Sequence, residues 1–229
     1  EQRLKQLESH HDWQGLADVL EQGLAAAQDQ TVKAELHWRL GRLLYGQFLQ
    51  GVRALKHFQD AFKLNPVLIE ALGEARSIYW ELGKLNMVQK LLELQLKSTQ
   101  DGAQRTLLFR ELGDVLCDSG DYERATEAYA KALQSAGGAP NDAGDRLADV
   151  QASETDWQDR VGELLRTAHE SASAAAKSDA FIRAARIAKR YAPSEYEGIL
   201  AQAYSADPTN VKAAAIYEGL LVETERTER

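Results

Sequence analysis

The stretch GDYERATEAYAKAL, residues 120–133, has the pattern of one short helix. Its small residues Ala125, Ala128 and Ala132 and its ring Tyr129 fall on a single stripe at helical spacing. An ordinary surface helix fills that stripe with larger apolar side chains such as Leu and Ile. Because small side chains let another backbone come close, we expect this helix to pack tightly against near-copies of itself.

The sequence just before this helix completes a recognisable unit. The segment FRELGDVLCDSGDYERATEAYAKAL, residues 109–133, carries Phe109, Leu112, Gly113, Leu116, Gly120, Ala125, Tyr129 and Ala132. In type and spacing these residues resemble a tetratricopeptide repeat, which is a pair of antiparallel helices. The resemblance implies that Gly113 lets the first helix approach the second and that Ala125 accepts it from the other side. Gly120 and Asp121 are then expected to form the turn and the cap of the second helix.

Weaker copies of this unit recur along the chain at the spacing of the repeat. Ala54 and Val88 lie one tetratricopeptide period of about 34 residues apart. The turn between Gly41 and Ala54 is expected to be enlarged relative to the clearest repeat. The matching positions of the two copies are Leu40, Gly41, Leu44, Ala54, Phe58, Ala61 and Pro66 in one, and Leu72, Ala75, Tyr79, Gly83, Val88 and Leu92 in the other.

The two ends of the chain fit the same scheme. HDWQGLADVLEQGL, residues 11–24, aligns with the opening stretch, so residues 1–10 are expected to be a shortened first helix. TDWQDRVGELLRTA, residues 155–168, repeats its Asp-Trp-Gln start, and residues 209–226 are predicted to be a final single helix. Trp13 and Trp157 are interpreted as aromatic side chains that pack the turn between two helices.

These copies predict an all-α, right-handed superhelical solenoid of antiparallel helix pairs, with about six hairpins and a terminal helix. We expect tetratricopeptide-like repeats in residues 1–134 and degenerate repeats with a capping helix in residues 143–229. The loop at residues 135–142 is rich in Gly and Pro and is the best candidate for a hinge. One continuous solenoid with a bend is expected rather than two separable domains.

Composition supports a folded helical protein and excludes several classes of partner. Of the 229 residues, 44% are hydrophobic and 27% charged, which is typical of a globular chain rather than a disordered one. The net charge of −8 argues against general binding to nucleic acid or to anionic membranes. No apolar run is long enough to span a membrane, so we expect a cytoplasmic protein. The start at Glu1 rather than Met suggests a fragment or a processed form.

The sequence offers no clustered set of groups for catalysis, and we predict no catalytic residues, no metal site and no cofactor. The five histidines are scattered, and His10-His11-Asp12 is interpreted as a polar turn. Cys117 lies beside Asp114 and Asp118, which would raise its pKa, so we interpret it as a packed residue rather than a nucleophile. No glycine-rich phosphate-binding loop is present.

The resemblance to tetratricopeptide repeats implies a concave groove lined by the first helix of each pair. Three aromatic residues there, Trp38, Tyr45 and Trp80, are costly to expose unless they meet a partner. For the charged residues the competing interpretation is a solvated helix face. Carried onto this chain, the groove positions are Glu35, Trp38, Arg39, Arg42, Tyr45, Glu70, Glu74, Ser77, Trp80, Glu81, Arg110, Glu111, Asp114 and Asp118. A secondary basic strip is expected at Arg183, Arg186, Lys189 and Arg190.

Some tetratricopeptide proteins clamp a ligand's C-terminal carboxylate with Lys and Asn, but here Trp38, Arg42 and Glu74 stand at those positions. The predicted function is therefore a non-enzymatic adaptor that binds a mixed-charge amphipathic peptide or helix of a partner protein in its groove. Two alternatives stay open: an architectural module that associates with itself, and a recruiting or regulatory module of an enzyme whose catalytic part is absent. The sequence leaves the oligomeric state undetermined.

Overall fold

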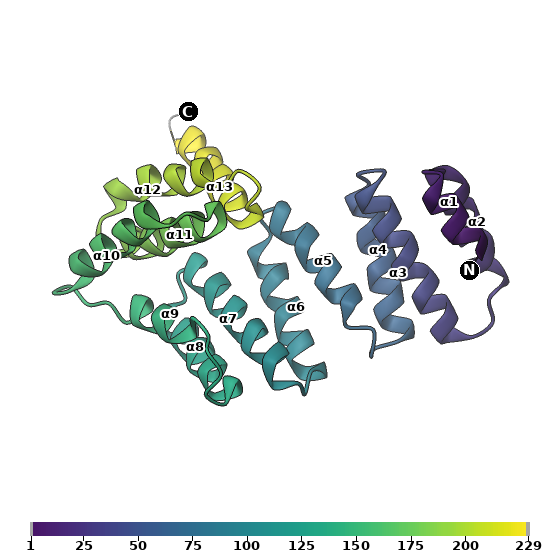
Figure 1. Ribbon diagram of the computed structural model, residues 1–229, viewed down its shortest axis with the longest axis horizontal. Coiled ribbons are helices and arrows are strands. Elements are labelled where there is room, and N and C mark those ends of the chain that lie inside the picture. Colours follow the sequence, from purple (N-terminus) through teal and green to yellow (C-terminus); the bar gives the residue numbers. More distant parts are fainter. Residues whose placement is uncertain (1, 228–229) are drawn as a thin grey trace. The chain divides into compact units, whose positions relative to one another are not determined.

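The computed structural model describes residues 2–227, and within them the chain forms thirteen helices and no strand (Figure 1). The expected all-α fold class is therefore confirmed. The helices are α1 (Gln2–Ser9), α2 (Trp13–Ala26), α3 (Gln30–Gly46), α4 (Gly51–Leu64), α5 (Glu70–Glu81), α6 (Leu85–Ser98), α7 (Gly102–Asp118), α8 (Tyr122–Ala136), α9 (Ala143–Val150), α10 (Trp157–Glu170), α11 (Ala174–Tyr191), α12 (Pro193–Ala206) and α13 (Val211–Thr227).

Contacts within the chain divide it into two compact units. The first unit ends at Ile78 and the second begins at Tyr79, so the division falls inside α5. Of residues 135–142, which the sequence singled out as a hinge, the first two belong to α8, and residues 137–142 join α8 to α9 inside the second unit. The two units are described separately below.

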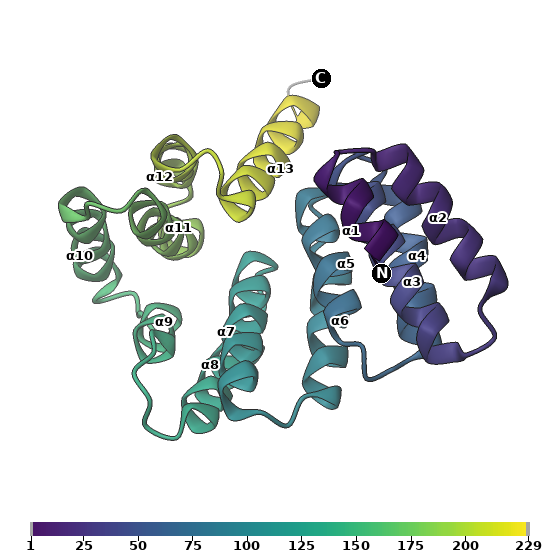
Figure 2. The ribbon, with the colours of Figure 1, turned by 45° about the vertical axis from the view of Figure 1, so that its right-hand side comes forward.

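Antiparallel pairs of consecutive helices form most of the packing. In the first unit α3 lies against α4, and in the second α7 lies against α8 and α11 against α12 (Figures 1 and 2). The segment between the last two pairs is less regular, because α9 packs mainly on α8 while α10 packs mainly on α11. Neighbouring helices thus stack on one another without forming a regular hairpin at every step.

A glycine of the first helix meets an aromatic ring of the second in the two clearest pairs. A Cβ atom on Gly113 would lie 2.5 Å from Cε1 of Tyr129, and one on Gly41 would lie 2.6 Å from Cε1 of Phe58. Gly113 was expected to face Ala125, but the Tyr129 ring, one turn further along α8, fills the space over it. Tyr129 and Phe58 are among the most fully buried side chains of the described residues.

The turns between paired helices have the relative lengths that the sequence predicts. Residues 119–121 join α7 to α8, whereas residues 47–50 join α3 to α4, which gives the enlarged turn that was expected. Gly120 has φ of +81° in the short turn, a conformation that glycine adopts without strain. Aspartates cap several helix starts: the side chains of Asp29, Asp101 and Asp121 each accept a hydrogen bond from the backbone N–H three residues on.

Candidate functional site

An open cavity of about 590 Å³ lies between α1, α2 and α3 in the first unit. Its floor is apolar, because Leu16, Leu20 and Leu43 are almost completely buried beneath it. Trp13 and Trp38 face it from α2 and α3 and are partly exposed. The cavity is lined by Leu4, Glu8, Trp13, Leu16, Leu20, Trp38, Arg39, Arg42, Leu43, Gly46 and Gln47.

Two arginines of α3 form the charged rim of this cavity. Nε of Arg39 lies 2.7 Å from Oε1 of Glu35, and Nε of Arg42 lies 3.3 Å from Oε1 of Glu74. The Arg42 guanidinium also lies over the Trp38 ring, 5.1 Å from its centroid. The side chains of Arg39 and Arg42 are 41% and 57% exposed, and exposed ion pairs contribute at most about 1 kcal/mol. Neither ion pair therefore contributes much to the stability of the first unit.

Trp38 carries an unusual feature in the cavity wall. Its indole N–H is buried and has no hydrogen-bond acceptor among the described residues. A buried indole N–H usually finds an acceptor, and its absence costs free energy.

Three of the predicted groove residues, Trp38, Arg39 and Arg42, line this cavity together. Glu74 joins them through its ion pair with Arg42, while Ser77 is exposed and donates its hydroxyl to the Gly73 carbonyl. Tyr45 is half-buried on α3 and is not part of the lining.

The opposite wall, built by α1 and α2, was missed from the sequence. Leu4, Glu8, Leu16 and Leu20 belong to it, and Trp13, interpreted as a turn-packing residue, also lines the cavity. The alignment of residues 11–24 with the clearest repeat was the signal that could have placed α2 beside α3.

Trp80 was expected on an exposed groove surface, and the structure corrects this expectation. Its side chain is 3% exposed and packs in the core of the second unit with residues such as Val88, Leu92 and Leu112. The Trp80 indole N–H donates to Oε1 of Glu111 at 3.2 Å, and the Lys212 ammonium lies 5.4 Å from the ring centroid. Trp80 is a core residue because α6 and α7 cover it.

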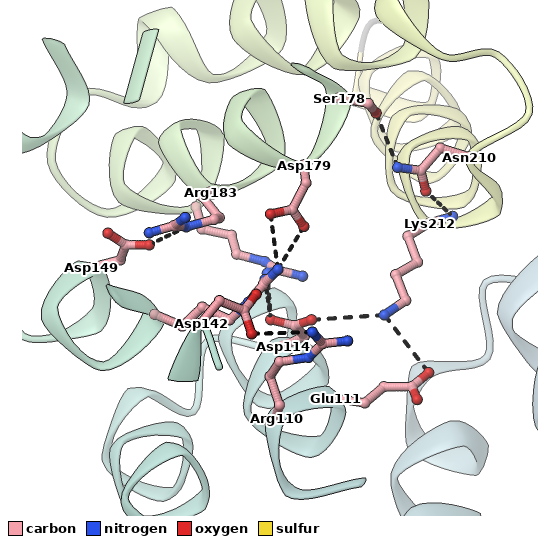
Figure 3. A network of polar contacts seen from close by, with 12 residues as sticks. Arg110, Glu111, Asp114, Asp142, Asp149, Ser178, Asp179, Arg183, Asn210 and Lys212 are labelled. Atoms are coloured by element: carbon pink, nitrogen blue, oxygen red, sulfur yellow. Dashed lines mark hydrogen bonds and ion pairs between the residues drawn. The ribbon is translucent and has the colours of Figure 1, made fainter. Parts of the chain in front are cut away.

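Asp114, another predicted groove residue, is the centre of a buried polar network in the second unit (Figure 3). Its Oδ1 accepts hydrogen bonds from the Tyr129 hydroxyl at 2.9 Å, from Arg146 at 2.9 Å and from Arg186 at 2.8 Å. Lys212 of α13 places its ammonium 3.7 Å from Oδ2. Burial alone would raise the pKa of Asp114, but these three cations hold it well below its ordinary value.

Arg146 extends the network to other helices. Its guanidinium bonds to Asp142 at 2.8 Å and to both carboxylate oxygens of Asp179, at 2.7 and 2.9 Å. Asp142 also accepts from Arg110, another predicted groove residue, at 3.1 Å (Figure 3). Helices α7, α9, α11 and α13 are therefore tied together by charges inside the second unit.

The predicted basic strip is occupied by internal partners. Arg183 donates to Asp149 at 2.5 Å, and Arg186 donates to Asp118 at 2.7 and 2.8 Å as well as to Asp114. Lys189 donates to the Asp118 backbone carbonyl at 2.8 Å. Arg190 lies between two tyrosine rings, 5.1 Å from the centroid of Tyr122 and 4.8 Å from that of Tyr191. The strip is not the open basic surface that its spacing predicted, since α7 and α9 supply carboxylates and carbonyls to it.

Cys117 is packed in the second unit, in agreement with the sequence. It is 5% exposed, and its Sγ lies 3.8 Å from the Tyr129 hydroxyl. Burial raises the pKa of the Cys117 thiol to about 11, so the thiol is protonated at neutral pH and a poor nucleophile. No group of three or more metal-ligating side chains comes together in residues 2–227, and no helix in that range is long and apolar enough to cross a membrane.

No protein-family model matches the sequence, and no curated protein matches it. Solved structures do resemble it in fold. PilF from Pseudomonas aeruginosa aligns with a TM-score of 0.52 at 15% identity over 97% of this chain and 95% of that chain. YrrB, described as a TPR protein with an unusual peptide-binding site, aligns with a TM-score of 0.49 at 18% identity over 86% of this chain and 97% of that chain. MamA aligns with a TM-score of 0.47 at 14% identity over 95% and 96% of the two chains.

Proposed function

The chain has a tetratricopeptide-like fold, and we propose that it is a non-enzymatic scaffold that binds a segment of a partner protein in the cavity of its first unit. The observation that carries this proposal is the cavity itself, which combines an apolar floor with a charged rim. Protein-binding sites of this kind take an apolar anchor in the centre and polar contacts around it.

The chemistry of the lining indicates the kind of segment. Trp13 and Trp38 and the leucines of the floor provide an apolar surface for one or two bulky side chains. Arg39 and Arg42 supply positive charge at the rim, and Glu8 supplies the negative charge. An amphipathic helix with a large apolar side chain flanked mainly by acidic residues meets these groups best.

Gly46 offers a direct test, because it lines the cavity and no atom lies within 4 Å of a Cβ added there. Gly46→Phe should fill the cavity without disturbing the fold. Peptides selected against the protein from a display library of amphipathic helices should bind Gly46→Phe at least about tenfold more weakly by calorimetry. Trp38→Ala should weaken the same peptides by a similar factor.

Gly162→Phe is the matched control, since Gly162 lies in α10 of the second unit and also has open space around its Cβ position. This variant should bind the peptides as the parent chain does. If no peptide is enriched, or if the selected peptides bind Gly46→Phe unchanged, the cavity is not the binding site.

A further inference from the structure

Two histidines of the first unit form a direct contact between α3 and α4. Nδ1 of His37 lies 2.9 Å from Nδ1 of His57, and the ring centroids are 5.1 Å apart. With the two Nδ1 atoms 2.9 Å apart, a centroid separation of 5.1 Å means that the two Nδ1 atoms point at each other. One imidazole therefore carries the proton on Nδ1 and donates it, while the other accepts with its lone pair.

This hydrogen bond needs at least one neutral ring. If both imidazoles are protonated, neither Nδ1 can accept, and two positive charges face each other across the α3–α4 contact. Both side chains are half-buried, so water screens this repulsion only in part. The bond is replaced by repulsion when the second proton is bound.

Burial favours the neutral pair, and several nearby cations act in the same direction. Burial lowers the pKa of both His37 and His57, and each lies near other cations: Lys33 and Lys56 act on His37, and Arg53 and Lys56 act on His57. Asp60 is the opposing group and raises both. The pair is thus held neutral at pH 7.

The helix that carries His37 also carries much of the cavity. His37 directly precedes Trp38, and α3 supplies Trp38, Arg39, Arg42, Leu43 and Gly46 to the lining. A change in how α3 lies on α4 therefore changes the positions of these side chains relative to α1 and α2.

We propose that His37 and His57 form a pH-sensitive latch that fixes α3 on α4 at neutral pH and loosens the binding cavity in mild acid. The binding part of this inference rests on the proposed function, whereas the latch itself is a property of the α3–α4 pair. The latch would make binding in the cavity depend on pH.

The direction of the pH effect follows from linkage. Because both pKa values are lower in the folded chain than the ordinary value of 6.5, the unfolded or opened state binds protons first as the pH falls. The latch therefore stabilises the pair fully above about pH 6.5 and loses this contribution as the pH drops through the folded pKa values.

Hydrogen exchange of the α3 and α4 amides tests the latch without any ligand. After correction for intrinsic exchange, opening of these amides should increase at least about tenfold between about pH 7.5 and pH 5.5. Amides of α11 and α12, in the second unit, serve as the internal reference. Peptides selected against the cavity should lose affinity over the same pH range.

His37→Asn is the decisive variant, because an Asn side chain can offer either its oxygen or its NH₂ at the position of Nδ1. His57 then keeps a partner in either charge state and loses the repulsion from a second imidazolium, so the pH effect on opening and on binding should become clearly smaller, with only the burial of His57 remaining. His169→Asn, in α10, should keep both effects. Nitrogen chemical shifts of the imidazoles should show a shared Nδ1 proton on His37 and His57.

The latch is excluded if opening of α3 and α4 does not change with pH in the parent chain, or if His37→Asn keeps the full change. These outcomes differ from failure of the proposed function, in which peptides fail to bind at every pH while hydrogen exchange still responds.

Discussion

Single side chains set how closely the paired helices approach. Gly113 and Gly41 have no Cβ, and the Tyr129 and Phe58 rings occupy the space where one would be. The Tyr129 hydroxyl in turn donates to Asp114, which links this packing contact to the polar network of the second unit. Gly113 thus makes room for a ring that packs between the two helices and also donates a hydrogen bond to the buried Asp114.

Gly113→Leu should therefore force Tyr129 out of place and lower the free energy of unfolding by roughly 1–3 kcal/mol or more. Gly162→Leu is the comparison, because no atom lies within 4 Å of its Cβ position on α10, and it should be neutral or slightly stabilising. Chemical denaturation of both variants measures the difference. Equal stabilities would show that the Gly113–Tyr129 contact is not tightly packed.

Aspartate N-caps fix the starts of several helices. Asp101 begins α7 by accepting from the Gln104 backbone N–H at 2.8 Å, and Asp29 does the same for α3 with Val32 at 2.9 Å. These caps satisfy donors that the helix itself leaves unpaired. They also set where α7 begins, and α7 carries Asp114 and much of the second unit's core.

Asp101→Ala should lower the free energy of unfolding by about 1 kcal/mol, because the Gln104 N–H loses its acceptor. Asp101→Asn keeps a side-chain oxygen in the same place and should cost less. Thermal melts of the two variants against the parent distinguish them. The cap has no role if alanine and asparagine are equally well tolerated.

The second unit is held together by contacts between distant parts of the chain. Arg186 reaches Asp114 across 72 positions, and Lys212 of α13 approaches the same carboxylate. Arg146 adds a bond from α9. Asp114 is buried with these cations, so its negative charge is required to balance them.

Asp114→Asn should lower the free energy of unfolding by about 3–5 kcal/mol at neutral pH, because Arg146 and Arg186 would be left buried without full compensation. The folded pKa of Asp114 lies below its ordinary value of 3.8, so its contribution is present above about pH 4 and is lost as the pH falls further. The gap between parent and variant should be constant above that pH and shrink below it. Asp159→Asn, at an exposed position of α10, should leave stability nearly unchanged. A gap under about 1 kcal/mol would contradict the central role of Asp114.

The sequence by itself determined the helices and turns of the two clearest repeats, and it marked Gly41 and Gly113 as the points where the paired helices approach closely. These features are local or lie within one period, so spacing alone specifies them: the α3–α4 turn and the single terminal helix are examples. Trp38, Arg39 and Arg42 line one cavity, because one face of α3 carries all three.

Only the tertiary structure decided which inner-face residues stay open. Trp80, Asp114 and Arg186 have the spacing of open inner-face residues, yet the folded second unit buries Trp80 against α6 and α7. It buries Asp114 and Arg186 among α7, α9, α11 and α13. Whether such a residue is buried depends on the angles between successive helices. These angles add up along the chain and bring Asp114 and Arg186, 72 positions apart, into contact. No local sequence pattern specifies the combined effect of these angles. For the same reason, only the three-dimensional structure shows the α1–α2 wall of the cavity and the contact between His37 and His57.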